Sequence, residues 1–94
     1  MTNVTEKESK ALVKIISDAG NGATCAEEMK ADNFTWFDHT VIMQAGFSPE
    51  AACGIMSSLQ EKGLAQNYDP DGIFGWCLTD RGIDTAYKEK ARGQ

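Results

Sequence analysis

Positive charge is scarce in the middle of this 94-residue chain. From Asp18 to Asp84 the sequence has eleven acidic residues and only three basic ones, a net charge of -8, whereas the whole chain carries -5. The two ends of the chain are slightly basic and offset part of this excess. An acidic segment repels polyphosphate, so the middle of the chain is poorly suited to non-specific binding of nucleic acid.

Cysteine and histidine are also few, and their spacing argues against metal and disulfide chemistry. Cys25, Cys53 and Cys77 form no Cys-x-x-Cys pair, and His39 is the one histidine. Structural zinc sites use closely spaced ligand pairs, and a disulfide framework needs an even number of cysteines. We therefore expect three reduced, buried thiols, no metal site and no cofactor.

Catalytic motifs are absent from the sequence. It contains neither a glycine-rich phosphate loop nor a serine nucleophile motif. A Cys/His pair would require the fold to bring one of the cysteines to His39, which lies next to Asp38. We interpret His39 as a surface or partly buried helix residue and expect no enzymatic activity.

Long apolar runs are missing too. No stretch of about 18 apolar residues occurs, which argues against a membrane-spanning helix. The first residues, Met1 to Lys7, lack the charged-then-apolar layout of a secretory signal. A chain of this length, with 41% hydrophobic and 24% charged residues, suits one domain with one modest core. We expect a single cytoplasmic domain over residues 1–94.

Capping patterns predict three helices in the first half of the chain. In each pattern a threonine precedes an acidic residue by three positions, as in a capping box: Thr5 with Glu8, Thr24 with Glu27 and Thr35 with Asp38. These helices should end at Gly20, at about Ala31 and at Gly46, and the third should include Phe37. The first helix has an apolar stripe opposite a row of lysines: Leu12, Ile15, Ile16 and Ala19 against Lys7, Lys10 and Lys14.

The second half reads as helix, hairpin and helix. Ser48 followed by Pro49 is a strong helix start, and Gly63 suits the end of that helix. Residues 64–68 and 73–79 read as short strands around a turn at 69–72. The expected inner residues of these elements are, in chain order, Ala52, Ile55, Met56 and Leu59, then Phe74, Trp76 and Leu78, then Ile83, Ala86, Tyr87 and Ala91. Ile73, Gly75 and Cys77 should face away from the core, and Thr79 should cap the last helix, Asp80 to about Ala91.

This order of elements resembles a winged helix domain, and two motifs sharpen the resemblance. Residues 59–64, Leu-Gln-Glu-Lys-Gly-Leu, resemble the Leu-x-x-x-Gly-Leu passage from recognition helix to wing strand. Residues 78–82, Leu-Thr-Asp-Arg-Gly, resemble the Leu-Thr-x-x-Gly passage from the wing to the next helix. Both passages are typical of MarR-like and related winged helix regulators, and with Gly46-Phe47-Ser48 at the turn the resemblance covers residues 35–91. It implies an α+β, mainly α, winged helix-turn-helix fold with a short two-stranded wing hairpin and a C-terminal helix.

The helix that the resemblance assigns to DNA reading lacks the usual side chains for that task. Family members carry Ser, Thr, Arg or Lys on its outer face, whereas the outer-face residues here are small or acidic: Glu50, Cys53, Gly54, Ser57, Ser58 and Glu61. The wing tip carries Asp69 and Asp71 where relatives often have Arg or Lys. The chain also lacks the long extra helices that MarR-like proteins use to dimerise, so a homodimer stays an open question.

Two interpretations of function stay open. In the first, the recognition helix and wing bind an unidentified protein through the eight residues just named, and this acidic surface could attract a basic partner. In the second, the chain is a DNA-binding transcription regulator of the MarR-like type that relies on basic residues near its ends: Lys7, Lys10, Lys14, Lys88, Lys90 and Arg92. The absence of base-reading and phosphate-binding side chains favours the first.

Three aromatic residues, Phe34, Trp36 and Phe37, lie within four positions. They cannot all face one core from one short helix, so at least one should be exposed. The favoured interpretation is that they fill the space between the first helix and the hairpin. The alternative is an apolar patch for self-association or partner binding.

Overall fold

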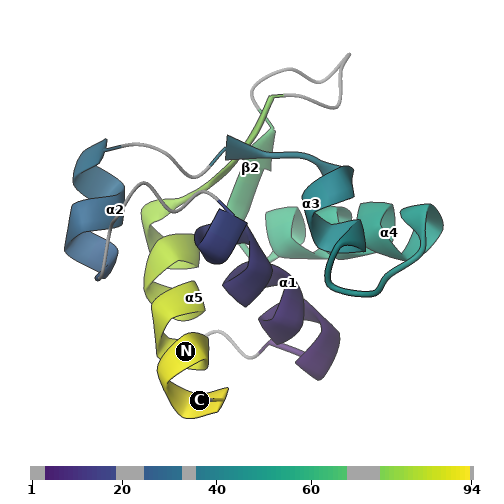
Figure 1. Ribbon diagram of the computed structural model, residues 1–94. Helices are drawn as coiled ribbons and strands as arrows, with labels where there is room; N and C mark the ends of the chain where they lie inside the picture. The colour runs from purple at the N-terminus through teal and green to yellow at the C-terminus, as the bar shows by residue number, and fades with distance from the viewer. Residues whose placement is uncertain (1–3, 19–24, 33–35, 68–74, 94) are drawn as a thin grey trace.

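The computed structural model describes residues 4–18, 25–32, 36–67 and 75–93. In these ranges the chain is mainly helical, with a small antiparallel sheet between the helices, which agrees with the predicted α+β, mainly α class (Figure 1). The elements are, in order, α1 (Glu6–Asp18), α2 (Ala26–Asp32), β1 (Trp36–Phe37), α3 (His39–Met43), α4 (Pro49–Glu61), β2 (Ala65–Asn67), β3 (Trp76–Leu78) and α5 (Asp80–Gly93).

The capping box predicted for the first helix is present. The backbone N–H of Thr5 donates to Oε1 of Glu8 at 2.7 Å, and the N–H of Glu8 donates to Oγ1 of Thr5 at 3.1 Å. Each group satisfies a backbone donor that the first helical turn leaves without a partner. The predicted stripe Leu12, Ile15 and Ile16 is buried. Ala19 and Thr24, which belong to the predictions for α1 and α2, lie outside the described residues.

The prediction of one continuous helix from Thr35 to Gly46 is wrong at its start. Trp36 and Phe37 form strand β1, and Asp38 caps α3 by accepting a hydrogen bond from the N–H of Thr40 at 2.9 Å. Bulky aromatic residues suit a pleated, half-buried strand, and Asp is among the best N-cap residues. After α3 the chain turns at Gly46, whose φ of +105° is favourable only for glycine, as the sequence predicted.

Helix α4 has the start and the end that its sequence predicts. The side chain of Ser48 accepts a hydrogen bond from the N–H of Ala51 at 3.2 Å, and Pro49 occupies the first turn. The chain leaves the helix at Gly63 with a φ of +75°. Its inner face is buried as predicted, by Ala52, Ile55, Met56 and Leu59. The opposite face of α4 is therefore turned outward.

The sheet has three strands in the order β1-β3-β2, one more than the predicted hairpin. Strand β3 is central, so both of its edges are paired. Cys77, predicted to face outward, is 5% exposed because its small side chain lies between those of its cross-strand partners Trp36 and Gln66. Trp76 and Leu78 are buried as predicted, whereas the predicted turn at 69–72, Ile73 and Phe74 lie outside the described residues.

Helices α1 and α5 lie side by side and supply much of the core (Figure 1). In α5, Ile83 and Ala86 are buried and Tyr87 is half-buried, as predicted, but Ala91 is exposed and Glu89 is buried instead. The buried face of α5 is therefore slightly rotated from the predicted one. It includes residues spaced by four and three positions, which are Gly82, Ala86 and Glu89.

The passage from α4 through β3 into α5 depends on close backbone contact. The N–H of Thr79 donates to the carbonyl of Leu64 at 3.0 Å, and its hydroxyl donates to the carbonyl of Gly63 at 2.7 Å. Thr79 also caps α5, because its Oγ1 accepts from the N–H of Gly82 at 3.0 Å. A Cβ at Gly82 would lie 1.9 Å from the carbonyl oxygen of Leu64. The two quoted motifs therefore meet at one tightly packed junction.

In the part of the chain that the structure describes, no helix has the length and apolarity needed to cross a membrane.

Candidate functional site

The outer face of α4 consists of small and acidic side chains. Five of the six predicted α4 residues are exposed: Glu50, Cys53, Gly54, Ser57 and Glu61. Gly54 lies at the middle of this face, and apart from its chain neighbours and the backbone of α4 itself, no atom of the described residues comes within 4 Å of the position that a Cβ would take there. We call these five residues the α4 face. Asp69 and Asp71, the predicted wing residues, lie outside the described residues.

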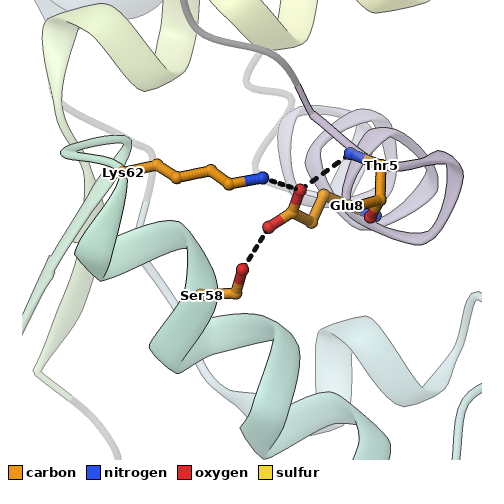
Figure 2. Close-up of polar contacts among 4 residues, drawn as sticks. All are labelled: Thr5, Glu8, Ser58 and Lys62. Carbon is orange, nitrogen blue, oxygen red and sulfur yellow. Dashed lines mark hydrogen bonds and ion pairs between the residues drawn. The ribbon is translucent and has the colours of Figure 1, made fainter.

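Ser58, the sixth predicted residue, does not belong to the α4 face. It is half-buried, and its hydroxyl donates a hydrogen bond to Oε2 of Glu8 on α1 (Figure 2). Ser58 follows Gly54 by four residues, so a helical wheel places it near the α4 face, but its hydroxyl is turned toward α1 by the contact with Glu8. Ser58 joins two helices of the same chain.

Glu8 is the centre of a polar cluster that the sequence did not predict. Its side chain is 3% exposed and accepts three hydrogen bonds, from the N–H of Thr5, the hydroxyl of Ser58 and Nζ of Lys62, the last at 2.5 Å (Figure 2). We call Thr5, Glu8, Ser58 and Lys62 the Glu8 junction. The capping box was visible in the sequence, but Lys62 is 54 positions away, and no local pattern indicates that pairing.

The pKa of the Glu8 carboxyl is set by opposing effects. Burial by itself raises the pKa, whereas hydrogen bonds from Lys62, Ser58 and Thr5 and the positive charge of Lys62 lower it. The lowering effects prevail, and the pKa of Glu8 lies below its ordinary value of 4.5. Glu8 is therefore an anion at neutral pH in spite of its burial.

The lowered pKa of Glu8 makes the stability of the protein depend on acid. A carboxyl whose pKa is lower in the folded chain stabilises the fold above its unfolded pKa, and this contribution is lost as the pH falls through the folded pKa. We expect the free energy of unfolding, measured by urea denaturation, to fall below pH 4.5 more steeply for the native protein than for Glu8→Gln. Glu6→Gln, a change at an exposed carboxylate two residues away, should follow the native curve. Equal slopes for all three proteins would contradict this assignment.

Lys62 is the single basic residue in the segment from Ser48 to Lys62, which covers α4 and its caps. Its ammonium group is engaged by Glu8, and its side chain is 30% exposed. A second cation, Arg81 at the start of α5, is exposed, and its guanidinium lies 3.8 Å from where a Cβ on Gly63 would be. The one basic residue of α4 and its caps, the C-cap Lys62, is thus directed toward α1.

The predicted basic residues of α1 and α5 are interleaved with acids. Lys10 lies 4.0 Å from Glu6, and Arg92 lies 2.9 Å from the buried Glu89. Glu6, Lys10, Lys14 and Glu89 line one shallow groove, whereas Lys7 borders a different groove beside Gly54. Lys7, Lys88 and Lys90 are exposed and Lys14 is half-buried. Lys10 and Lys14 therefore share their groove with acidic residues, and Lys7 lies at a different groove.

The thiols differ from the prediction. Only Cys77 is buried, whereas Cys25 and Cys53 are exposed, and none of the three forms a disulfide. Exposure follows position, since Cys53 lies on the α4 face and Cys25 directly precedes α2. Among the described residues, no group of three His, Cys, Asp or Glu side chains is placed to hold a metal ion.

His39 is half-buried at the start of α3, in agreement with its interpretation as a partly buried helix residue. Its Nδ1 atom is buried without a hydrogen-bond partner among the described residues.

The aromatic residues before α3 divide between core and surface. Phe37 is 5% exposed and contacts Trp76, with ring centroids 6.2 Å apart and planes tilted by 47°. Trp36 is 47% exposed, as one member of the group was predicted to be. Phe34 lies outside the described residues. The strand alternation explains the difference, because neighbouring residues of β1 point to opposite faces of the sheet.

Comparisons of the chain with protein-family models, with curated proteins and with solved structures found no match.

Proposed function

We propose that this protein is a non-enzymatic, cytoplasmic winged helix module that recognises a macromolecule through α4 and the adjoining hairpin, and that its target is a protein rather than DNA. The order of elements, with α3, a turn at Gly46, α4, two strands and α5, supports the winged helix assignment. So does the junction at which Thr79 and Gly82 join α5 to the end of α4. On this assignment α4 is the recognition helix.

The observation that carries the choice of target is the composition of the α4 face. A recognition helix in the major groove uses Arg or Lys for phosphates and guanine, and Asn or Gln for adenine. The α4 face offers two carboxylates and three small residues, and Lys62 is held by Glu8. Carboxylates next to phosphates would lower the affinity for any DNA sequence.

The same face suits a basic protein partner. Glu50 and Glu61 are eleven residues apart on α4, which places them about 16 Å apart along the helix axis. Between them the surface is low at Gly54, so that a partner could approach the helix closely. Basic groups of the partner would pair with Glu50 and Glu61 at the two ends of α4 and so orient the partner. Between these two pairs, the partner would pack closely against the helix at Gly54.

A DNA-binding regulator of the MarR-like type is the second candidate. The resemblance favours it, and Lys7, Lys88 and Lys90 are exposed and able to meet phosphates. Their separation, with Lys7 on α1 beside α4 and the others on α5, favours weak contacts rather than one phosphate track.

Adding positive charge to the α4 face should create DNA binding that the native protein lacks. We expect the native protein to bind a 20-base-pair duplex at physiological salt with a Kd weaker than about 100 μM. The double variant Gly54→Arg, Ser57→Arg should bind at least about tenfold more tightly and with a steeper salt dependence. Fluorescence anisotropy at several salt concentrations measures both quantities.

A matched variant separates local from overall charge. Ser17→Arg with Ala31→Arg adds the same charge at exposed positions outside α4 and should change the affinity less than twofold. Tight, salt-dependent binding by the native protein would refute the choice of target. In a pull-down from cells, Gly54→Arg should abolish capture of a partner that the native protein retains.

A further inference from the structure

We propose that Glu8 is a specificity-determining residue, which holds Lys62 against α1 and so keeps nucleic acid from binding at the end of α4. The inference rests on the proposed function, in which α4 is the recognition helix. Glu8 lies on another helix and belongs to no predicted binding set.

The side chain of Lys62 points toward α1. Lys62 follows Ser58 by four residues, so the two side chains lie on the same side of α4, next to α1. Figure 2 shows the Lys62 side chain extended from the end of α4 toward the carboxylate of Glu8, which also meets the hydroxyl of Ser58. The ammonium group is therefore committed to the contact between two helices of this chain.

The N-terminal cap of α1 does not require a negative charge at position 8. Glutamine completes a capping box as well as glutamate does, because its amide oxygen accepts the same hydrogen bond from Thr5. Buried ion pairs also contribute little net stability compared with neutral side chains of similar volume. For the surface of α4, the consequence of the negative charge of Glu8 is the engagement of Lys62.

The C-terminal end of α4 lies next to a positive charge on α5. Arg81 is exposed next to Gly63, so this end already has one cation. Loss of the charge of Glu8 would make a second cation available near this end of α4, and each added phosphate contact strengthens binding and its salt dependence. With Lys62 engaged, the exposed α4 carboxylates Glu50 and Glu61 dominate the face.

The test is DNA affinity at 20 mM salt, where weak binding is measurable, with a 20-base-pair duplex as the probe. Glu8→Gln should bind about fivefold more tightly than the native protein, and its slope of log affinity against log salt should become steeper by about 0.9, one additional phosphate contact. Glu8→Gln with Lys62→Met should return to the native affinity. Circular dichroism spectra and melting curves establish that each variant is folded.

Glu6→Gln is the matched control, since it removes the same charge from a carboxylate that is 86% exposed and lies 4.0 Å from Lys10. It should change the affinity less than twofold. If it matches Glu8→Gln, or if Lys62→Met does not cancel the gain, the proposal is overturned.

A measurement on the native protein tests the engagement of Lys62 without any variant. On brief acetylation at pH 8, followed by peptide mass spectrometry, Lys62 should react at least fivefold more slowly than the exposed Lys7. Equal rates would overturn the proposal. Tight DNA binding by the native protein would instead refute the proposed function, so the two failures are distinguishable.

Discussion

Replacing Gly82 with alanine is expected to destabilise the protein by about 3 kcal/mol, at the upper end of the usual cost of overpacking. A Cβ at this position would lie 1.9 Å from the carbonyl oxygen of Leu64 and 2.9 Å from its carbonyl carbon. Both atoms belong to the backbone, so no side-chain rotation relieves the clash. The first turn of α5 would have to move away from Leu64, and the hydrogen bond from the N–H of Thr79 to that carbonyl would lengthen or break.

Urea denaturation followed by circular dichroism measures this effect, and Gly54→Ala is its matched control. Gly54 is also a helical glycine, but apart from its chain neighbours and the backbone of α4 itself, no atom of the described residues lies within 4 Å of its Cβ position. Alanine there should stabilise the protein by about 1 kcal/mol, the difference in helix propensity between the two residues. The prediction fails if Gly82→Ala unfolds at the native urea concentration.

Replacing Lys62 with methionine is expected to lower the free energy of unfolding by about 2 kcal/mol at pH 7, because it leaves a buried carboxylate without its cation. The loss is smaller than for a fully buried pair, since the Lys62 side chain is 30% exposed and solvent screens part of the interaction. Ser58 and the N–H of Thr5 would still donate to Glu8, which limits the damage.

The pH dependence of the Lys62→Met variant identifies the cause. Without Lys62, burial still raises the pKa of Glu8, but only the hydrogen bonds from Ser58 and Thr5 remain to lower it. This carboxyl therefore takes up a proton at higher pH than in the native protein. The native protein loses its Glu8 contribution as the pH falls, whereas the variant has already lost most of it. The difference in stability between the two should therefore shrink from pH 7 to pH 3.

A double-mutant cycle completes this test. Glu8→Gln together with Lys62→Met removes both charges, and we expect this protein to be more stable than Lys62→Met alone. If the single and double variants unfold at the same urea concentration, the charge of Glu8 is not the source of the loss.

Gly54 and Glu8 both shape the proposed recognition surface. Gly54 lowers the stability of α4 relative to alanine and leaves its outer face open. Glu8 directs the C-cap lysine of α4, Lys62, away from that face. Both features keep the α4 face small and acidic, which is the property on which the choice of a protein target depends.

Local signals in the sequence were sufficient for most helix boundaries. The capping box at Thr5, the Ser48-Pro49 start of α4 and the glycines at 46 and 63 depend on contacts within a few residues, so their patterns are visible in the chain itself. The start of α3 was misplaced because two local signals competed. A Thr-x-x-Asp pattern overlapped a strand whose pairing with β3, about 40 residues later, no local signal reveals.

Long-range contacts account for the features that the sequence left undetermined. The burial of Cys77 depends on strands on both sides of β3, and the exposure of Ala91 depends on the rotation of α5 against its neighbours. Gly82 is needed because the carbonyl of Leu64 lies where a Cβ would be, and the Leu-Thr-x-x-Gly motif alone does not reveal that contact.

The amino-acid sequence by itself determined most helix boundaries, the inner face of α4 and the acidic, small-residue composition of its outer face, since each follows from local periodicity, caps and side-chain chemistry. The tertiary structure alone decided which polar residues remain available. It turned Ser58 and Lys62 toward the buried Glu8, because hydrogen bonds and charge in a water-poor contact between α1 and α4 outweigh the exposure that a helical wheel predicts.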